Sequence, residues 1–441
     1  MYKEFLRALS SGGAALAVSM SAPAIAQAGE GQATTIARLQ VQGEQPDHQH
    51  MQMNMSPAAW QFMQEAIVWA MFDHQGGPRG GDGFKTPNWW MGMLTRKVGS
   101  SQFTFNTMFS LDPATVGTRG YREIFQVGEA VDGAPLIDHQ HPHDLFMQLA
   151  AIWRTPVGGT TGFTLAGGPV GEPALGPVAF MHRASAAENP VAPLTHHTFD
   201  STHLAFGVVT AAVDHGPWVV EGSVFNGREP DENRWDFDFG RLDSVSGRVW
   251  FRPTDALEFQ VSTGHLKHPE ELDPNNMQRT TTSASWFKRD GTDFTALTVG
   301  YGVNATEDAN RHGVFVEATR HVGLTSIFGR VEAVQVETNL LLTDALPLTH
   351  DGAARKDMVG AFTVGGVRDF LRRHGFEGGL GASVTLYAVP DALNVTHGDR
   401  PVSFHVFFRL RPPAGSMGRM WNMRMSQPMV GHSMQMKHDA N

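Results

Sequence analysis

The chain contains no cysteine among its 441 residues. This absence excludes a disulfide framework and a thiolate metal site, so a soft metal ion would have to be held by methionine and histidine. Charged residues are also scarce, at 18%, compared with about a quarter in ordinary soluble domains. The net charge is −10 and no Lys/Arg-rich run occurs, which argues against a nucleic-acid partner.

Long apolar runs are absent as well. After the N-terminal leader, no segment approaches the roughly 20 apolar residues that a membrane helix requires. A chain of this kind that crosses a membrane must therefore cross it as a β-barrel. What the sequence does contain is 48 glycines, together with 28 Phe and 10 Trp against only 4 Tyr. This balance suits an all-β protein with many turns and an apolar outer surface.

The N-terminus, "MYKEFLRALSSGGAALAVSMSAPAIAQAGE", has the three parts of a secretory signal peptide. Lys3 and Arg7 supply the positive region, a stretch of small apolar residues follows, and Ala26-Gln27-Ala28 forms an A-x-A cleavage site. We predict that residues 1–28 are a signal peptide and that the mature protein is exported.

The next 47 residues divide into two expected parts. Residues 29–55 are polar and predict a flexible arm. Residues 56–75 open with Ser56-Pro57, which is typical of a helix N-cap followed by proline at the first helical position. Apolar residues then recur at helical spacing, which predicts a short amphipathic helix over 56–75. These residues are Trp60, Met63, Ile67 and Met71.

From residue 88 to residue 411 the pattern changes to runs of about ten residues separated by Gly, Asp, Asn and Pro. Very short links, such as 97–101 and 321–324, alternate with long polar loops, such as 227–240 and 339–355. This alternation is typical of an outer-membrane barrel with short periplasmic turns and long extracellular loops. We predict a transmembrane antiparallel β-barrel of about 14–16 strands. The alternatives are a large soluble β-sandwich or a β-propeller, and the lack of a 40- to 50-residue repeat argues against the propeller.

Two segments rich in methionine and histidine flank the expected barrel, one in the arm and one in the flexible tail of residues 412–441. Thioether sulfur suits Cu(I) and Ag(I), whereas imidazole binds both copper and zinc. The segments therefore predict a copper ion as ligand and no organic cofactor, with an incidental compositional bias as the alternative. The candidate ligands are His48, His50, Met51, Met53, Met55, Met420, Met423, Met425, Met434, Met436 and His438.

A third cluster lies between these segments, in "DHQHPHD" at 138–144 and in the stretch 181–203. We expect some of its side chains to converge in the barrel lumen or at its mouth, as a metal site or as a polar network. The His-x-His string resembles a metallohydrolase motif but lacks the supporting acidic pattern, so no enzyme is predicted. The candidate ligands here are His139, His141, His143, His182, His196, His197, Asp200 and His203.

Together, the signal peptide, the barrel-like runs and the arm "DHQHMQMNM" resemble the outer-membrane β-barrel proteins of bacterial copper-resistance systems, of the copper resistance protein B type. The resemblance implies an outer-membrane protein of a Gram-negative bacterium that binds or transports copper or a similar soft metal ion. Its expected partners are outer-membrane lipid, metal ions and periplasmic metal-handling proteins. Two other functions stay open: a general porin for small solutes and a soluble periplasmic metalloenzyme of β fold.

Overall fold

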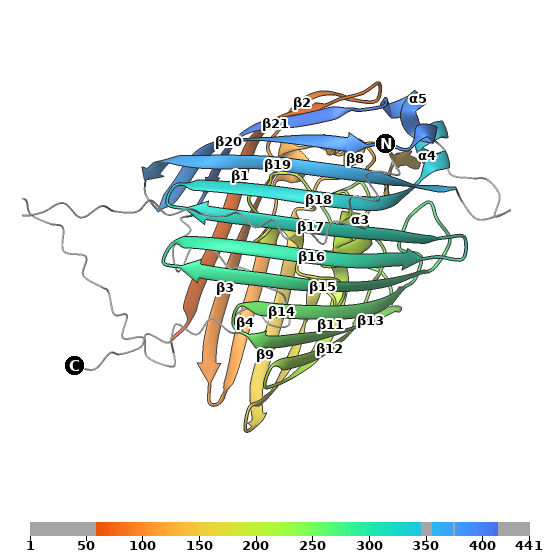
Figure 1. Cartoon of the computed structure of the whole chain (residues 1–441). Helices are drawn as coiled ribbons and strands as arrows, with labels where there is room; N and C mark the ends of the chain where they lie inside the picture. Colours follow the sequence, from red (N-terminus) through yellow and green to blue (C-terminus); the bar gives the residue numbers. More distant parts are fainter. Residues whose placement is uncertain (1–58, 345–354, 374, 413–441) are drawn as a thin grey trace, which may run out of the picture. The chain divides into compact units, whose positions relative to one another are not determined.

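The computed structural model describes residues 59–344, 355–373 and 375–412. The expected signal peptide (1–28), the arm (29–55) and the tail from residue 413 onward lie outside the described residues, as do all eleven candidate ligands of the two Met/His segments. The described chain forms a 17-stranded antiparallel sheet. Sixteen of its strands close into a barrel, because β1 pairs with β3 on one side and with β21 on the other (Figure 1).

The strand count agrees with the predicted 14–16. The barrel strands are β1 (Gln61–Gln75), β3 (Asn88–Val98), β4 (Ser101–Phe109), β9 (Phe146–Gly158), β10 (Thr161–Gly171), β11 (Ala205–His215), β12 (Trp218–Phe225), β13 (Ser244–Thr254), β14 (Leu257–Leu266), β15 (Met277–Asp290), β16 (Asp293–Ala305), β17 (Asn310–Val322), β18 (Thr325–Glu337), β19 (Lys356–Arg373), β20 (Phe376–Ala388) and β21 (Val402–Arg411). The remaining strand, β2 (Gly81–Lys85), pairs with the end of β1.

The connections differ in length at the two ends of the barrel. The links after β3, β9, β11, β13, β15, β17 and β19 are each two residues long, and all other links are longer. These lengths confirm the predicted alternation of short turns and long loops. The long links contain short helices and strands. These elements are α2 (Asp112–Thr115), β5 (Tyr121–Arg122), β6 (Glu129–Val131), β7 (Ala134–Leu136), β8 (His139–Gln140), η1 (Phe180–His182), α3 (His196–Phe199), η2 (Ser201–His203), α4 (Thr338–Thr343), η3 (Asp391–Leu393) and α5 (Asn394–His397).

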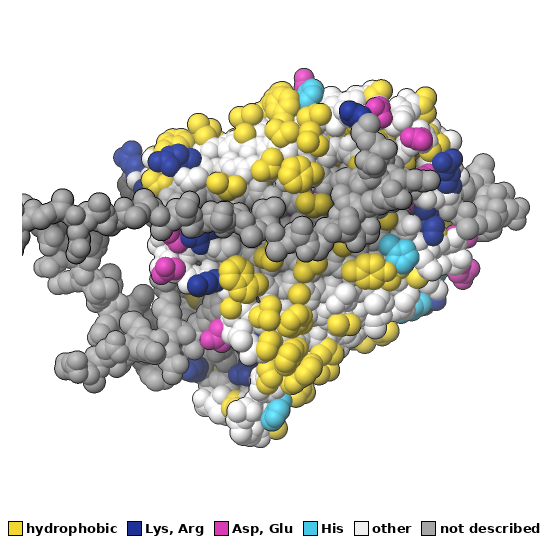
Figure 2. All heavy atoms as spheres, viewed as in Figure 1, with side chains coloured by type: hydrophobic (Ala, Val, Ile, Leu, Met, Phe, Trp, Pro, Cys, Tyr) yellow, Lys and Arg dark blue, Asp and Glu magenta, His cyan; other side chains and the backbone are white. Residues whose placement is uncertain are grey.

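Side chains alternate between the lumen and the outer face along each strand. In β12, Val219, Glu221, Ser223 and Phe225 are buried inside, whereas Trp218, Val220 and Val224 are exposed outside. Figure 2 shows hydrophobic side chains spread over the visible outer face. An apolar outer face around a closed sheet is the surface that a lipid bilayer solvates, and closure leaves no unpaired strand edge in the membrane.

The final strand, β21, shows the same rule. Val402, Phe404 and Val406 are exposed outside, whereas Ser403, His405, Arg409 and Arg411 are buried inside. Phe407 breaks the polar pattern of the inner face because its ring packs edge-on against Trp69, with ring centres 5.2 Å apart. No helix among the described residues is long and apolar enough to span a membrane.

The predicted amphipathic helix over 56–75 is wrong, because residues 61–75 form β1, the first barrel strand. The barrel consequently begins at Gln61 instead of residue 88. The helical spacing of Met63, Ile67 and Met71 coincides with part of a period-two pattern, in which Ile67, Trp69 and Met71 all face the lumen and are buried. A strand with apolar residues on both faces loses the alternation that identifies a β-strand.

The lumen of the barrel is filled by two long connections. The link between β10 and β11, here called the plug segment (residues 172–204), has no exposed residue. It contacts widely separated parts of the wall: Ala174 N donates to Ser223 Oγ of β12, and Thr195 Oγ1 donates to Glu332 Oε1 of β18. The β4–β9 connection (residues 110–145) packs beside it, with Tyr121 Oη accepting a hydrogen bond from Ala192 N.

Candidate functional site: histidines and methionines in the barrel lumen

Buried ion pairs hold the plug segment to the wall. Arg183 donates from Nε to Glu317 Oε1 of β17 at 2.5 Å and from Nη1 to Asp200 Oδ2 at 2.9 Å. Ser185 Oγ donates to the same Glu317 oxygen at 2.9 Å. All three charged side chains are at most 2% exposed. A buried charge costs several kcal/mol unless it is paired, so these residues depend on one another.

A second ion-pair cluster holds the middle of the plug segment. Glu188 pairs with Arg409 and with Arg411 of β21, and the Arg411 pair spans 2.6 Å. Asp369 of β19 accepts two hydrogen bonds from Arg409, at 2.7 and 2.9 Å. The plug segment is thereby tied to the strand that closes the barrel.

Five histidines converge between the plug segment and the β4–β9 connection. Ring centres lie 5.4 Å apart for His196 and His197, 5.5 Å for His196 and His203, 5.7 Å for His141 and His197, and 5.9 Å for His143 and His203. We call His141, His143, His196, His197 and His203 the lumen histidine cluster. Pro142 ends the strand β8 after Gln140, so the three alternate histidines of "DHQHPHD" do not share one face.

The other two predicted histidines lie beside or outside this cluster. His182 follows Met181 in the plug segment, and its ring packs edge-on against Trp89 with ring centres 5.0 Å apart. His139 Nδ1 bonds instead to the backbone oxygen of Ile137, and the residue pairs with Arg122 in a two-stranded sheet.

Carboxylates and backbone carbonyls fix the orientation of three cluster histidines. Nδ1 of His143 donates to Asp112 Oδ2 at 2.9 Å, Nδ1 of His196 donates to Asp200 Oδ1 at 2.8 Å, and Nδ1 of His203 donates to the backbone oxygen of Asp200 at 2.7 Å. Both carboxylate oxygens of Asp200 are thus engaged, one by His196 and one by Arg183. Asp200, which was predicted to be a metal ligand, therefore orients His196 and pairs with Arg183.

Burial lowers the pKa of several histidines here and thus favours their neutral form. It lowers the pKa of His182 and of His196 to about 4 and the pKa of His203 to about 3. It also lowers the pKa of His141 well below its ordinary value, and the nearby Arg234 charge acts in the same direction. Burial raises the pKa of Asp200, but the charge of Arg183 and the hydrogen bond from His196 outweigh it and lower that pKa overall. Neutral imidazole is the form that binds metal ions.

Acidic side chains face the other side of the cluster. His141 Nε2 lies 3.2 Å from Glu129 Oε1, and Arg234 pairs with Glu129 at 2.8 Å. Burial raises the pKa of Glu129 to about 7, although Arg234 acts against this rise. Gly128 adopts φ +126°, and a Cβ at this position would lie 2.6 Å from His197 Nδ1, so only glycine fits there.

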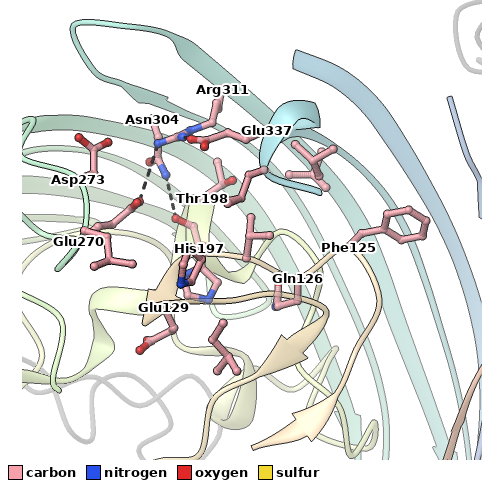
Figure 3. A pocket seen from close by; sticks show the side chains of 18 of the residues that line it. Phe125, Gln126, Glu129, His197, Thr198, Glu270, Asp273, Asn304, Arg311 and Glu337 are labelled. Carbon is pink, nitrogen blue, oxygen red and sulfur yellow. Dashed lines mark hydrogen bonds and ion pairs between the residues drawn. The ribbon is translucent and has the colours of Figure 1, made fainter. Parts of the chain in front are cut away.

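Two small cavities adjoin the cluster. The first, of about 80 Å³, is lined by Glu129, His197, Glu270 and Arg311, and Asn304 donates a hydrogen bond to the His197 backbone oxygen at its edge (Figure 3). The second, of about 50 Å³, is lined by His141, His143, Met181 and Trp89. Since one water needs about 10–15 Å³ by this measure, each cavity holds only a few waters.

A wall of methionines, which the sequence reasoning missed, faces the plug segment. Met91 and Met93 of β3 point inward and are 0% exposed, and Met91 lies opposite Met108 of β4 in the strand register. The missed signal is the period-two string "WWMGM", whose alternate members share one face. The wall, with Met181 of the plug segment packed on it, comprises Met63, Met71, Met91, Met93, Met108, Met147 and Met181.

A carboxylate cluster lies outside the lumen site. Within the described ranges, Asp231, Asp236 and Asp238 are the only three side chains whose ligand atoms all lie within 4.8 Å of one another. They belong to the loop between β12 and β13 and are largely exposed. The lumen imidazole nitrogens are more widely spaced than this.

Comparisons with known proteins found similar solved structures but no related sequence. No protein family and no curated protein sequence matches the chain. Similar solved structures include the anion-selective porin from Comamonas acidovorans, with 11% identity, a TM-score of 0.46, and coverage of 80% of this chain and 100% of that chain. OmpT of Vibrio cholerae has 10% identity, a TM-score of 0.46, and coverage of 81% and 99%. Pseudomonas putida OprB has 8% identity, a TM-score of 0.49, and coverage of 80% and 94%.

The names of these neighbours describe porins and outer-membrane proteins. The likeness concerns the fold, which the strand pairing of this chain establishes independently. The protein is thus a closed antiparallel β-barrel of sixteen strands, with an apolar outer face and a lumen filled by its own connections.

Proposed function

We propose that the protein is a gated outer-membrane channel for small solutes and that the plug segment closes it. The observation that carries this proposal is a 16-stranded barrel with the plug segment packed inside. Barrels of this strand number enclose an aqueous channel when their lumen is free. Here the plug segment has no exposed residue, so passage through the part of the lumen that it fills requires the segment to move.

The plug segment packs on the wall through apolar side chains, among them Phe180 and Met181, and through polar contacts. The polar contacts support movement of this segment. Its ends and middle are attached through ion pairs and hydrogen bonds, such as Arg183 with Glu317 and Arg411 with Glu188. Such groups can exchange protein partners for water when the segment leaves the wall, whereas an apolar core has no comparable alternative. The test is single-channel recording of the purified protein in planar lipid bilayers under an applied voltage. We expect rare openings of uniform size, and a barrel that stays silent even without its plug segment would overturn the proposal.

A second function, handling of copper or a similar soft metal ion, is favoured by a separate observation. The lumen contains a wall of seven methionines, of which Met181 lines a cavity together with His141 and His143 of the histidine cluster. Thioether and neutral imidazole are the uncharged ligands that Cu(I) and Ag(I) accept. These lumen ligands support the copper hypothesis independently of the Met/His segments at residues 48–55 and 420–438.

Metal binding by the methionine wall is testable with substitutions that conserve volume. The triple variant Met91→Leu, Met93→Leu and Met108→Leu is expected to bind fewer Cu(I) equivalents, because leucine has no sulfur ligand. Each substitution should lower the free energy of unfolding by less than about 1.5 kcal/mol, since leucine and methionine are similar in volume. Competition with a chromophoric Cu(I) chelator measures the stoichiometry. Met358→Leu, at an outward position of β19, is the matched control and should bind as the wild type does.

Deletion of residues 417–441 measures the contribution of the tail in the same assay. We expect it to remove further Cu(I) equivalents, because the tail carries Met420, Met423 and Met425. If neither the deletion nor the leucine variant changes the stoichiometry, soft-metal handling is the wrong function for these methionines.

A further inference from the structure

Three lumen histidines share one hydrogen-bonding arrangement. His143, His196 and His203 all use Nδ1 toward oxygen acceptors: the carboxylate of Asp112, the carboxylate of Asp200 and the backbone oxygen of Asp200. With Nδ1 as the donor, the nitrogen of each ring that can bind a metal ion is Nε2. Metal-binding histidines in proteins are almost always held in this manner, with the second ring nitrogen donating to a carboxylate or carbonyl.

One of these Nε2 atoms has no hydrogen-bond partner. The ring centre of His203 lies 5.9 Å from His143 and 5.5 Å from His196, and its Nε2 is buried and unpaired. Leaving a buried polar atom unpaired costs about 1–3 kcal/mol. Nδ1 of His182, beside Trp89, is also buried and unpaired. A bound cation would satisfy these nitrogens.

We propose that Nε2 of His143, His196 and His203 bind one divalent transition-metal ion and that this ion fastens the plug segment in the closed position. The proposal rests on the gated channel proposed above and names its regulator. His143 belongs to the β4–β9 connection, whereas His196 and His203 belong to the plug segment. One ion therefore joins two connections that otherwise meet through hydrogen bonds and packing.

The chemistry of the donors selects the class of ion. Three imidazoles suit Zn(II) and Cu(II), whereas calcium and magnesium require oxygen ligands. Metal–nitrogen bonds of about 2.0–2.1 Å require the three nitrogens to approach one another. Because the Nδ1 hydrogen bonds hold the rings, this approach requires the backbone segments that carry the three histidines to shift toward the ion, and His182 is the candidate for a fourth ligand. Asp112 and Asp200 are positioning residues, because they hold the protonated nitrogens away from the ion.

The first measurement is metal binding by the full-length protein, with Co(II) chloride as a spectroscopic probe. We expect the wild type to show the visible absorption of nitrogen-coordinated Co(II). The His203→Gln variant should bind one tight Co(II) equivalent fewer. Asp112→Asn should weaken binding about 10- to 100-fold while retaining the fold. His139→Gln, in the same connection but outside the cluster, is the matched control. An unchanged titration in His203→Gln would refute the site.

The second measurement is channel opening in planar bilayers, with Zn(II) or a chelator added. Zn(II) should lower the open probability of the wild type and of His139→Gln, whereas His203→Gln should not respond. Co(II) binding without any effect of Zn(II) on opening would refute the fastening role. A barrel that stays silent even without its plug segment would refute the channel, while the Co(II) titration would still decide the metal site. A misfolded variant would lose the heat-dependent gel mobility of a folded barrel. If His203→Gln misfolds by this criterion, Asp112→Asn takes its place in both measurements.

Discussion

A barrel without its plug segment is expected to conduct ions many-fold better than the wild type. Gly171 and Ala205, which flank the segment, are direct partners in the β10–β11 register. A two-residue Asn-Gly turn can therefore join these strands without shifting any other strand pair. The remaining 16-stranded wall is wide enough to enclose an aqueous channel. Single-channel conductance in planar bilayers measures the change.

A matched control separates removal of the plug segment from the effect of chain engineering. Replacing Gly323-Leu324, the two-residue link between β17 and β18, with Asn-Gly introduces the same turn at the opposite end of the barrel. This variant should conduct like the wild type. If the deletion variant folds, as shown by its gel mobility, but conducts no better than the control, the plug segment does not close the channel.

Arg183→Ala is expected to destabilise the seated plug segment by about 3–5 kcal/mol, because it leaves buried charges without a partner. Arg183 neutralises Glu317 and Asp200, and all three side chains are at most 2% exposed. Hydrogen exchange of residues 172–204 should rise strongly, while exchange in the barrel strands stays slow. Open probability in bilayers should rise in parallel.

The complementary variant tests whether charge is the cause. Arg183→Met combined with Asp200→Asn removes one positive and one negative charge together and leaves Glu317 paired with Arg330, which for buried ion networks is often neutral. Slow exchange should return in this double variant. Arg241→Ala, at an exposed position of the loop between β12 and β13, controls for loss of an arginine and should stay within about 0.5 kcal/mol of the wild type. Equal exchange in Arg183→Ala and Arg241→Ala would show that the ion pair does not hold the segment.

The wall of the barrel was predictable because membrane strands obey a local rule. Polar and apolar residues alternate in β12 and β21, and Gly-containing two-residue links mark the turns. The rule fails in β1 because its inner face packs against the plug segment, so Ile67 and Trp69 are apolar where a water-filled lumen would require polar residues. That packing partner is about a hundred residues away in sequence, beyond the reach of any local pattern.

The candidate site was predictable in composition but not in geometry. The density of histidine between residues 139 and 203 indicated convergence, and the structure brings His141, His143, His196, His197 and His203 together. Asp112 could not be identified, because a lone Asp-Pro at the start of a short helix is common and its hydrogen bond to His143 spans 31 residues. Asp200 was expected as a ligand, yet its contacts with Arg183 and His196 are visible only in three dimensions.

The methionine wall also has a consequence for oxidative damage. Exposed methionine is readily converted to the sulfoxide, which turns an apolar side chain into a polar one. Met71, Met91 and Met93 are 0% exposed, so peroxide cannot reach their sulfur atoms while residues 172–204 are seated. The chain contains no cysteine, which removes the other easily oxidised sulfur. The closed barrel therefore keeps these methionines reduced, and displacement of the plug segment would expose them to oxidation.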